Sequence, residues 1–160
     1  MNKILSWAML KEKLDVLRKE GKKIVFTNGC FDILHVGHTR YLNEAKKAGD
    51  VLVLALNSDS SVRGLKGKMR PLNPEADRAY VAASLEAVDY VTIFSGLTPL
   101  KLIEYLQPDV IVKGGDWKEE DVVGGAAVKK WGGKVLIMPE TEGASSTNMI
   151  ERIIKVYSHP

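Results

Sequence analysis

Short apolar runs recur along the chain and alternate with longer segments in which apolar residues are spaced three or four apart. The runs are rich in valine, isoleucine and leucine, and they predict buried strands at 24–26, 51–56, 90–93, 110–112 and 135–138. The run at 51–56 is almost wholly apolar, which is typical of a strand buried on both faces of a parallel sheet.

The segments between these runs predict helices. After Ser6, residues Leu10, Leu14 and Leu17 follow helical spacing, and Gly21 stands where such a helix ends. Further helices are predicted from near Gly37 to Gly49, from Asn73 to about Ala87, from Pro99 to about Leu106, from about Glu119 to Trp131, and after a cap at Ser146. Residues 57–72 are polar and basic and are expected to form a loop.

Alternating strands and helices indicate βαβ units, and five strands fit the length of the chain. The expected fold is therefore α/β, with a Rossmann-like, doubly wound, five-stranded parallel sheet. Ligands of such open sheets lie past the carboxyl ends of the strands. The loops 27–38, 57–72, 113–117 and 139–146 follow strands. We expect these loops to converge at one edge of the sheet.

Composition supports one folded unit. The 160 residues suit a single domain over 1–160, with an extra N-terminal helix at about 6–20. Hydrophobic residues make up 45% of the chain and charged residues 27%, which excludes disorder over most of it. No run of about 18 apolar residues indicates a membrane span. The net charge of +3 is too small to indicate a nucleic acid partner.

Cysteine usage and the N-terminus bear on the compartment. Cys30 is the only cysteine, which excludes an intrachain disulfide and a four-cysteine zinc site. The first residues lack the uninterrupted apolar region and the cleavage site of a signal peptide. We therefore expect a cytoplasmic protein.

The candidate chemistry lies in the loop after the first strand. Neither a Gly-x-Gly-x-x-Gly fingerprint nor a P-loop is present, but His35, Gly37 and His38 stand where this loop enters a helix. Three interpretations are open: a phosphate site, a metal pair with Asp32 or Cys30 as third ligand, or polar residues at a helix start. The glycine and the helix N-terminus favour phosphate.

The order Gly-x-Phe-Asp-x-x-His-x-Gly-His over 29–38, followed by Ser-Ser-Thr at 145–147, resembles the nucleotidylyltransferase superfamily marked by the His-x-Gly-His motif. More specifically, residues from about 21 to 153 resemble the adenylyltransferase domain of bacterial heptose-phosphate enzymes. The matching stretches are TNGCFDILHVGH, LNSDSSVRGLKG, RPLNP, LEAVDYV, PDVIVKGGDW and SSTNMI. The resemblance therefore implies a nucleotidylyltransferase type of fold. In many bacteria the adenylyltransferase domain is fused to a sugar kinase. The sequence shows no kinase domain, so the stand-alone form is expected.

The resemblance also implies a reaction. AMP would pass from ATP to D-glycero-β-D-manno-heptose 1-phosphate, giving ADP-heptose and pyrophosphate for lipopolysaccharide core or other surface glycans. It implies Mg²⁺, no covalent intermediate and a homodimer, with no nucleic acid or membrane partner. Two alternatives are a superfamily relative resembling glycerol-3-phosphate cytidylyltransferase or FMN adenylyltransferase, and a module that binds ATP without turnover.

Site residues follow from the same resemblance. His35 and His38 would bind the triphosphate and stabilise the transition state, and Lys66 and Lys68 would bind phosphate, with a solvated basic loop as the alternative for the lysines. No residue is assigned as a metal ligand. The nucleotide would be held by Thr27, Asn28, Gly29, Phe31, Gly37, Lys113, Gly114, Gly115, Asp116, Ser145, Ser146 and Thr147.

Several further residues have open roles. Arg63 and Arg70 are secondary phosphate candidates, and Arg78 is expected to form a surface ion pair. Asp32 is expected to orient its loop. Trp117 either stacks on a base or covers the edge of the core, and the second is favoured. The N-terminal helix either packs on the sheet or forms a dimer interface. Glu140 stands where the cytidylyltransferases carry arginine, which favours ATP over CTP.

Overall fold

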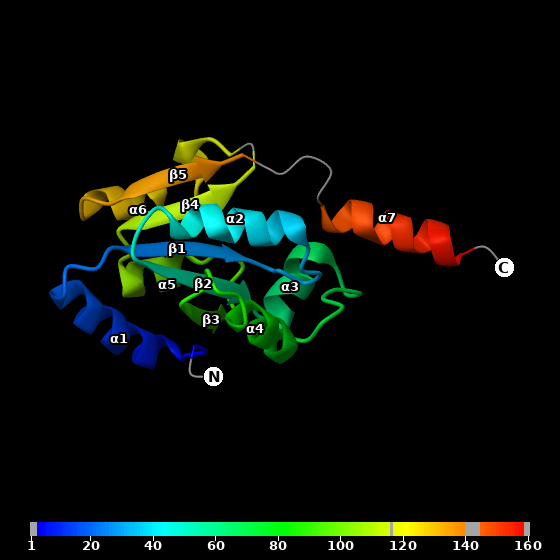
Figure 1. Cartoon of the computed structure of the whole chain (residues 1–160), viewed down its shortest axis with the longest axis horizontal. Helices are drawn as coiled ribbons and strands as arrows, with labels where there is room; N and C mark the ends of the chain where they lie inside the picture. The colour runs from blue at the N-terminus through cyan, green and yellow to red at the C-terminus, as the bar shows by residue number, and fades with distance from the viewer. Residues whose placement is uncertain (1–2, 116, 140–144, 159–160) are drawn as a thin grey trace.

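The computed structural model describes residues 3–115, 117–139 and 145–158. Its elements run in the order α1 (Trp7–Lys19), β1 (Ile24–Gly29), α2 (Val36–Lys46), β2 (Val51–Asn57), α3 (Asp59–Lys66), α4 (Glu75–Ala83), β3 (Tyr90–Phe94), α5 (Leu100–Leu106), β4 (Val110–Gly114), the 3-10 turn η1 (Glu119–Asp121), α6 (Gly125–Lys130), β5 (Lys134–Met138) and α7 (Ser146–Tyr157) (Figure 1).

The sheet confirms the predicted α/β class. Its five strands are all parallel and lie in the order β3-β2-β1-β4-β5. Side chains alternate between its faces: Ile24 and Phe26 of β1 join one apolar cluster, and Val25 joins the other. Both faces are thus buried, which explains why the strands are apolar throughout rather than at every second residue.

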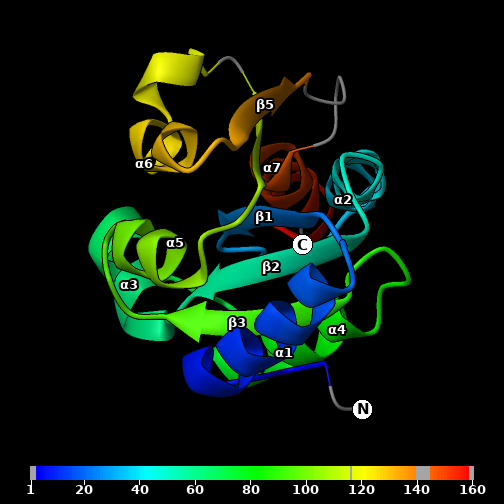
Figure 2. The same cartoon turned by 90° about the vertical axis from the view of Figure 1, so that its left-hand side faces the viewer.

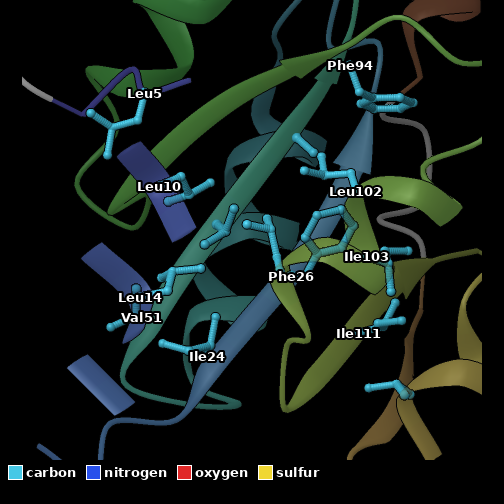
Figure 3. Close-up of a cluster of buried hydrophobic side chains, with 14 of the residues drawn as sticks. Leu5, Leu10, Leu14, Ile24, Phe26, Val51, Phe94, Leu102, Ile103 and Ile111 are labelled. Carbon is cyan, nitrogen blue, oxygen red and sulfur yellow. The ribbon is translucent and has the colours of Figure 1, made fainter. Parts of the chain in front are cut away.

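Helices cover each face of the sheet (Figure 2). On one face, Leu10 and Leu14 of α1 and Leu102 and Ile103 of α5 pack around Phe26 (Figure 3). On the other face, α2 and α4 contribute apolar side chains, chiefly Leu42, Ala45, Ala79 and Ala82. Full burial of one leucine stabilises the fold by about 2 kcal/mol, so these contacts hold the helices in place.

The N-terminal segment packs on the sheet, one of the two alternatives that the sequence left open. Backbone hydrogen bonds join Leu5 N to Val91 O at 2.9 Å and Val91 N to Lys3 O at 2.8 Å. The indole N–H of Trp7 donates to Ile93 O at 2.8 Å. The segment before α1 therefore runs along β3 at the edge of the sheet, and α1 lies over one face (Figure 2).

The expectation of a loop over 57–72 is wrong in its first half, which contains α3. The helix is short and rich in serine and glycine, so helical propensity does not indicate it. Burial and capping support it: Val62 is fully buried, and the hydroxyl of the N-cap Ser58 accepts from Ser61 N at 3.2 Å. Packing and a side-chain cap thus outweigh weak local preference.

The single helix predicted from Glu119 to Trp131 is also wrong, because η1 and α6 are separate. Gly124 lies between them at φ +84°, a left-handed conformation that an α-helix cannot contain. Two helices differ at their ends as well. The helix begun near Asn73 starts at Glu75 and stops at Ala83, and the last helix is capped by Ser145 rather than Ser146.

The strand order places a crevice beside β1. Connections from β1 run to β2 on one side, and β4 lies on the other, so the winding of the sheet reverses between β1 and β4. At such a point the loops diverge and leave room for a ligand past the strand ends. The amino end of α2 meets this crevice. Among the described residues no helix is long and apolar enough to cross a membrane.

Candidate active site

A cavity of about 390 Å³ opens at the carboxyl ends of β1 and β4. It is lined by Asn28, Gly29, Cys30, Phe31, Asp32, His35, Gly37, His38, Tyr41, Lys66, Arg70, Lys113, Gly114, Trp117, Pro139, Ser145, Ser146 and Thr147. Segments from four separate loops thus meet, as expected from the sheet. The structure brings together most of the residues that the sequence singled out.

Four of those residues do not line this cavity or cannot be placed. Thr27 is fully buried beneath it, where its hydroxyl lies 2.6 Å from that of Tyr41. Lys68 is exposed in the loop after α3. Gly115 has φ +103°, and its N–H donates to Met138 O at 3.0 Å. Asp116 lies outside the described residues, as does Glu140.

The two histidines face each other at the start of α2, with ring centroids 3.9 Å apart. His35 is the N-cap of the helix, and its Nδ1 accepts from Gly37 N at 3.1 Å. A neutral His35 therefore carries its proton on Nε2, where it can donate to a ligand. The His38 ring also lies 4.9 Å from that of Phe31. The pair presents imidazole edges beside a helix N-terminus, which suits an anion.

His38 is neutral at physiological pH in the free protein. Burial lowers its pKa to about 4, and the nearby charges of His35 and Lys66 act in the same direction, against a hydrogen bond with the backbone of Ile33. Its Nδ1 is buried and has no hydrogen-bond partner among the described residues. A neutral imidazole carries one N–H, which can donate to a phosphate oxygen, and it adds no positive charge.

This depressed pKa predicts a pH-dependent loss of stability. An unfolded histidine titrates near 6.5, so between pH 6.5 and about 4 the unfolded chain binds more protons at His38 than the folded one. We expect the free energy of unfolding to fall as the pH drops through this window, and to fall less in His38→Gln. Urea unfolding at pH 7 and pH 4.5 measures both. An equal decrease in the two proteins would contradict the prediction, because carboxylates titrate alike in both.

The first loop has a constrained backbone. Phe31 has φ +46°, a left-handed conformation that non-glycine residues seldom adopt. Its ring folds back over Gly29, where an added Cβ would lie 2.8 Å from Phe31 Cε2. A side chain at position 29 would therefore force the Phe31 ring to shift. Strained backbone of this kind concentrates at binding sites, where surrounding contacts hold it.

Asp32 orients the loop, as expected from the sequence. Its buried carboxylate accepts from Leu72 N at 2.9 Å, from Asn73 N at 2.8 Å and from Arg70 Nε at 2.8 Å. Burial opposes ionisation, but the hydrogen bonds from Asn73, Leu72 and Arg70 outweigh it and lower the pKa of Asp32. The loop after β1 is thereby tied to the segment after α3.

Arg78 is buried, not a surface residue, so the expected surface ion pair is wrong. Its side chain is 1% exposed and donates to Asn73 O at 3.0 Å, to Cys30 O at 2.7 Å and to Asp59 Oδ1 at 2.8 Å. One guanidinium thus joins α3, α4 and the first loop. The sequence offered no signal for this role, because two of the three partners, Cys30 and Asp59, are distant along the chain.

The β4 side of the cavity carries Lys113, whose pKa is lowered by burial. Its Nζ lies 6.0 Å from the centroid of the half-exposed Trp117 ring. Gly114 allows Tyr41 to approach, since a Cβ there would lie 3.2 Å from the ring. The Tyr41 hydroxyl donates to Val112 O at 3.0 Å and so links α2 to β4.

The described residues contain no group of three histidine, cysteine or carboxylate side chains placed to hold a metal ion. Asp32 is occupied by its hydrogen bonds to 70–73, so it does not serve as the third ligand that a His35–His38 metal pair needs. The phosphate interpretation of the histidines is therefore favoured.

Known proteins match most of this chain at high sequence identity. A protein named bifunctional protein HldE from Geobacter metallireducens is 56% identical over 144 residues, which cover 90% of this chain and 29% of that protein. One of the same name from Syntrophotalea carbinolica is 53% identical, covering 92% and 30%. The chain thus spans about 30% of the length of these relatives.

Solved structures agree with the fold. A lipopolysaccharide core biosynthesis protein from Thermoplasma volcanium has a TM-score of 0.64 and 32% identity, covering 78% of this chain and all of that one. A pantoate-β-alanine ligase from Francisella tularensis, at 18% identity, has a TM-score of 0.66 over 98% of this chain and 78% of that one, and shows the fold alone. The family model described as cytidylyltransferase-like matches residues 26–152, which include the sheet except the first two residues of β1, and all described residues of the cavity. The resemblance seen in the sequence is confirmed, and the chain belongs to the cytidylyltransferase-like family.

Proposed function

We propose that this chain is an adenylyltransferase that moves AMP from ATP to D-glycero-β-D-manno-heptose 1-phosphate and releases pyrophosphate. The observation that carries the proposal is the meeting of three segments at one cavity: the His-Val-Gly-His helix start, Lys113-Gly114 at the end of β4, and the Ser-Ser-Thr start of α7. These are segments in which the sequence resembles the heptose-phosphate adenylyltransferase domain. The similarity to a protein named for lipopolysaccharide core biosynthesis supports the same acceptor class.

The residues suit phosphoryl chemistry without a general base. An oxygen of the sugar phosphate, already anionic at neutral pH, attacks the α-phosphorus of ATP. The bond from that phosphorus to the β-phosphate oxygen breaks, and its electron pair leaves with pyrophosphate. His35 and His38 would donate hydrogen bonds to the transferring group, and Lys66 and Lys113 would offset negative charge. No carboxylate needs to accept a proton.

Mg²⁺ enters this proposal as part of the substrate. When bound with ATP, it would supply positive charge that offsets the charge on the leaving pyrophosphate. The N-terminus of α7 would face the same phosphates, since Ser145 caps it by accepting from Asn148 N at 3.0 Å and Ser146 and Thr147 line the cavity. The backbone N–H groups of that first helical turn suit anionic oxygen.

The test is pyrophosphate release from a panel of nucleotides and phosphorylated acceptors. We expect release with MgATP and the heptose 1-phosphate, and much less with CTP and glycerol 3-phosphate. Release only with CTP and glycerol 3-phosphate would assign the chain to the alternative cytidylyl reaction. Tight ATP binding without release from any acceptor would indicate a sensing module.

Two expectations remain proposals. The reaction would take place in the cytoplasm, where ATP is available. The protein would act as a homodimer, which sedimentation equilibrium tests directly.

A further inference from the structure

The cations beside the cavity come from two sides of β1. Lys113 comes from β4, which lies next to β5, the strand that precedes α7 in the chain. Lys66 ends α3, and Arg70 follows in the next loop, both on the β2 side. Lys68 lies between them but is exposed and does not line the cavity. The structure therefore places an arginine at the cavity wall where the sequence favoured a second lysine.

Arg70 is fixed in orientation. Its Nε donates to Asp32 Oδ2 at 2.8 Å, and its side chain is 21% exposed, whereas that of Asp32 is 2% exposed. No hydrogen bond from Nη1 or Nη2 to another described residue accompanies this bond. The Arg70 side chain is thus held at its Nε. Its Nη1 and Nη2, which can donate two parallel hydrogen bonds to a phosphate, remain available.

The carboxylate that holds Arg70 is itself fixed from both sides. It accepts from the backbone N–H groups of Leu72 and Asn73, and the Asn73 amide donates to Asp32 O. Asp32 thus closes the 70–73 segment against the first loop. Arg70 can contact a ligand without the loss of side-chain freedom that a solvated lysine in the same loop would undergo.

The two sides of β1 suit different substrates. Of the nucleotide segments, Lys113-Gly114 ends β4, and Ser145 to Thr147 follows β5, the neighbour of β4 in the sheet. An acceptor phosphate that attacks the α-phosphorus in line must come from across the transferring group, so the β2 side is left for it. That side holds Lys66 and Arg70.

We infer that Arg70 binds the phosphate group of the acceptor, with Asp32 as the residue that positions it. The inference rests on the proposed function only in that the acceptor must carry a phosphate group. It does not require the acceptor to be a heptose. A fixed guanidinium favours a phosphate monoester, which it can contact through two oxygens, over an uncharged sugar.

The experiment compares KM values for the two substrates in Arg70→Ala, Arg70→Lys and the matched control Arg40→Ala, which removes an exposed arginine of α2 outside the cavity lining. In Arg70→Ala we expect KM for the acceptor to rise on the order of 10- to 100-fold, as for loss of a charged hydrogen bond, while KM for ATP changes by less than about threefold. Arg70→Lys recovers part of the loss. The control stays at the wild-type values.

The positioning role of Asp32 has its own readout. Asp32→Asn is expected to raise KM for the acceptor, and adding Arg70→Ala to it should raise KM no further than Arg70→Ala does alone, because the two act as one unit. If Asp32→Asn does not fold, Asp32→Glu, which keeps the charge but displaces it, takes its place in the cycle. Fully additive effects would refute the positioning role.

A rise in KM for ATP with an unchanged KM for the acceptor would overturn the assignment of Arg70, as would no change in either. These outcomes are separate from failure of the proposed function. If the wild-type protein releases pyrophosphate only with another phosphorylated acceptor, the proposed acceptor is wrong, and the same KM comparison with that acceptor still decides the role of Arg70.

Discussion

Replacing His38 with alanine is expected to lower kcat for pyrophosphate release by roughly 100-fold or more, as removal of one preorganised transition-state donor does. His38 lies between the rings of Phe31 and His35, at ring distances of 4.9 and 3.9 Å, so its imidazole is held where the helix N-terminus of α2 opens to the cavity. In the proposed reaction His38 would offer a hydrogen bond whose strength increases as charge develops on the transferring phosphate.

The split between kinetic constants makes this test specific. A donor used mainly in the transition state lowers kcat and kcat/KM together and leaves KM for ATP nearly unchanged. His38→Asn, which retains an N–H near the same place, should recover part of the rate. Thermal unfolding of each variant at pH 7 confirms that the fold is kept. A folded His38→Ala protein with wild-type kcat would remove His38 from the mechanism.

Replacing Arg78 with alanine is expected to have the largest effect on stability, a loss of about 3 kcal/mol in the free energy of unfolding, as for a buried charge pair that loses one partner. Its guanidinium satisfies the carbonyls of Cys30 and Asn73 and the carboxylate of Asp59 at once. Asp59 is 25% exposed, so water can take over part of that interaction. The carbonyls of the partly buried Cys30 and the exposed Asn73 lose a donor that is itself buried.

Urea unfolding at pH 7 measures the effect, with Arg40→Ala as the control for loss of one arginine from an exposed position. Arg78→Lys should fall between the two, since an ammonium keeps the charge but cannot reach three acceptors on different elements. Because Cys30 O belongs to the first loop, KM for ATP should rise in the folded fraction of Arg78→Ala. An unfolding free energy equal to that of the control would contradict a structural role for Arg78.

Much of the fold was predictable because strands buried on both faces must be apolar along their whole length. All five predicted strands are present, each at the predicted place and extended by one to three residues at an end. The errors fell where tertiary contacts override local preference. A serine-rich helix, α3, is supported by buried Val62, and Gly124 breaks a helix that spacing alone had joined.

The site was predictable in part for a similar reason. Loops that follow parallel strands meet at one edge of the sheet. The sequence alone therefore predicts that His35, His38, Lys113 and the Ser-Ser-Thr segment lie close together. The sequence could not distinguish Lys68 from Arg70, two residues apart on a basic loop. Which one faces the cavity depends on Asp32, 38 residues earlier, whose carboxylate holds Arg70.

The sequence by itself determined the α/β class, the number of strands, the family and the loops that carry the chemistry, because these follow from local periodicity and from short motifs. Only the tertiary structure decided the partners of single side chains. It buried Arg78, which local pattern placed on the surface, turned Asp32 toward the 70–73 segment, and laid α1 on the sheet. Such contacts join residues far apart in the chain, and their energies depend on burial that no local pattern specifies.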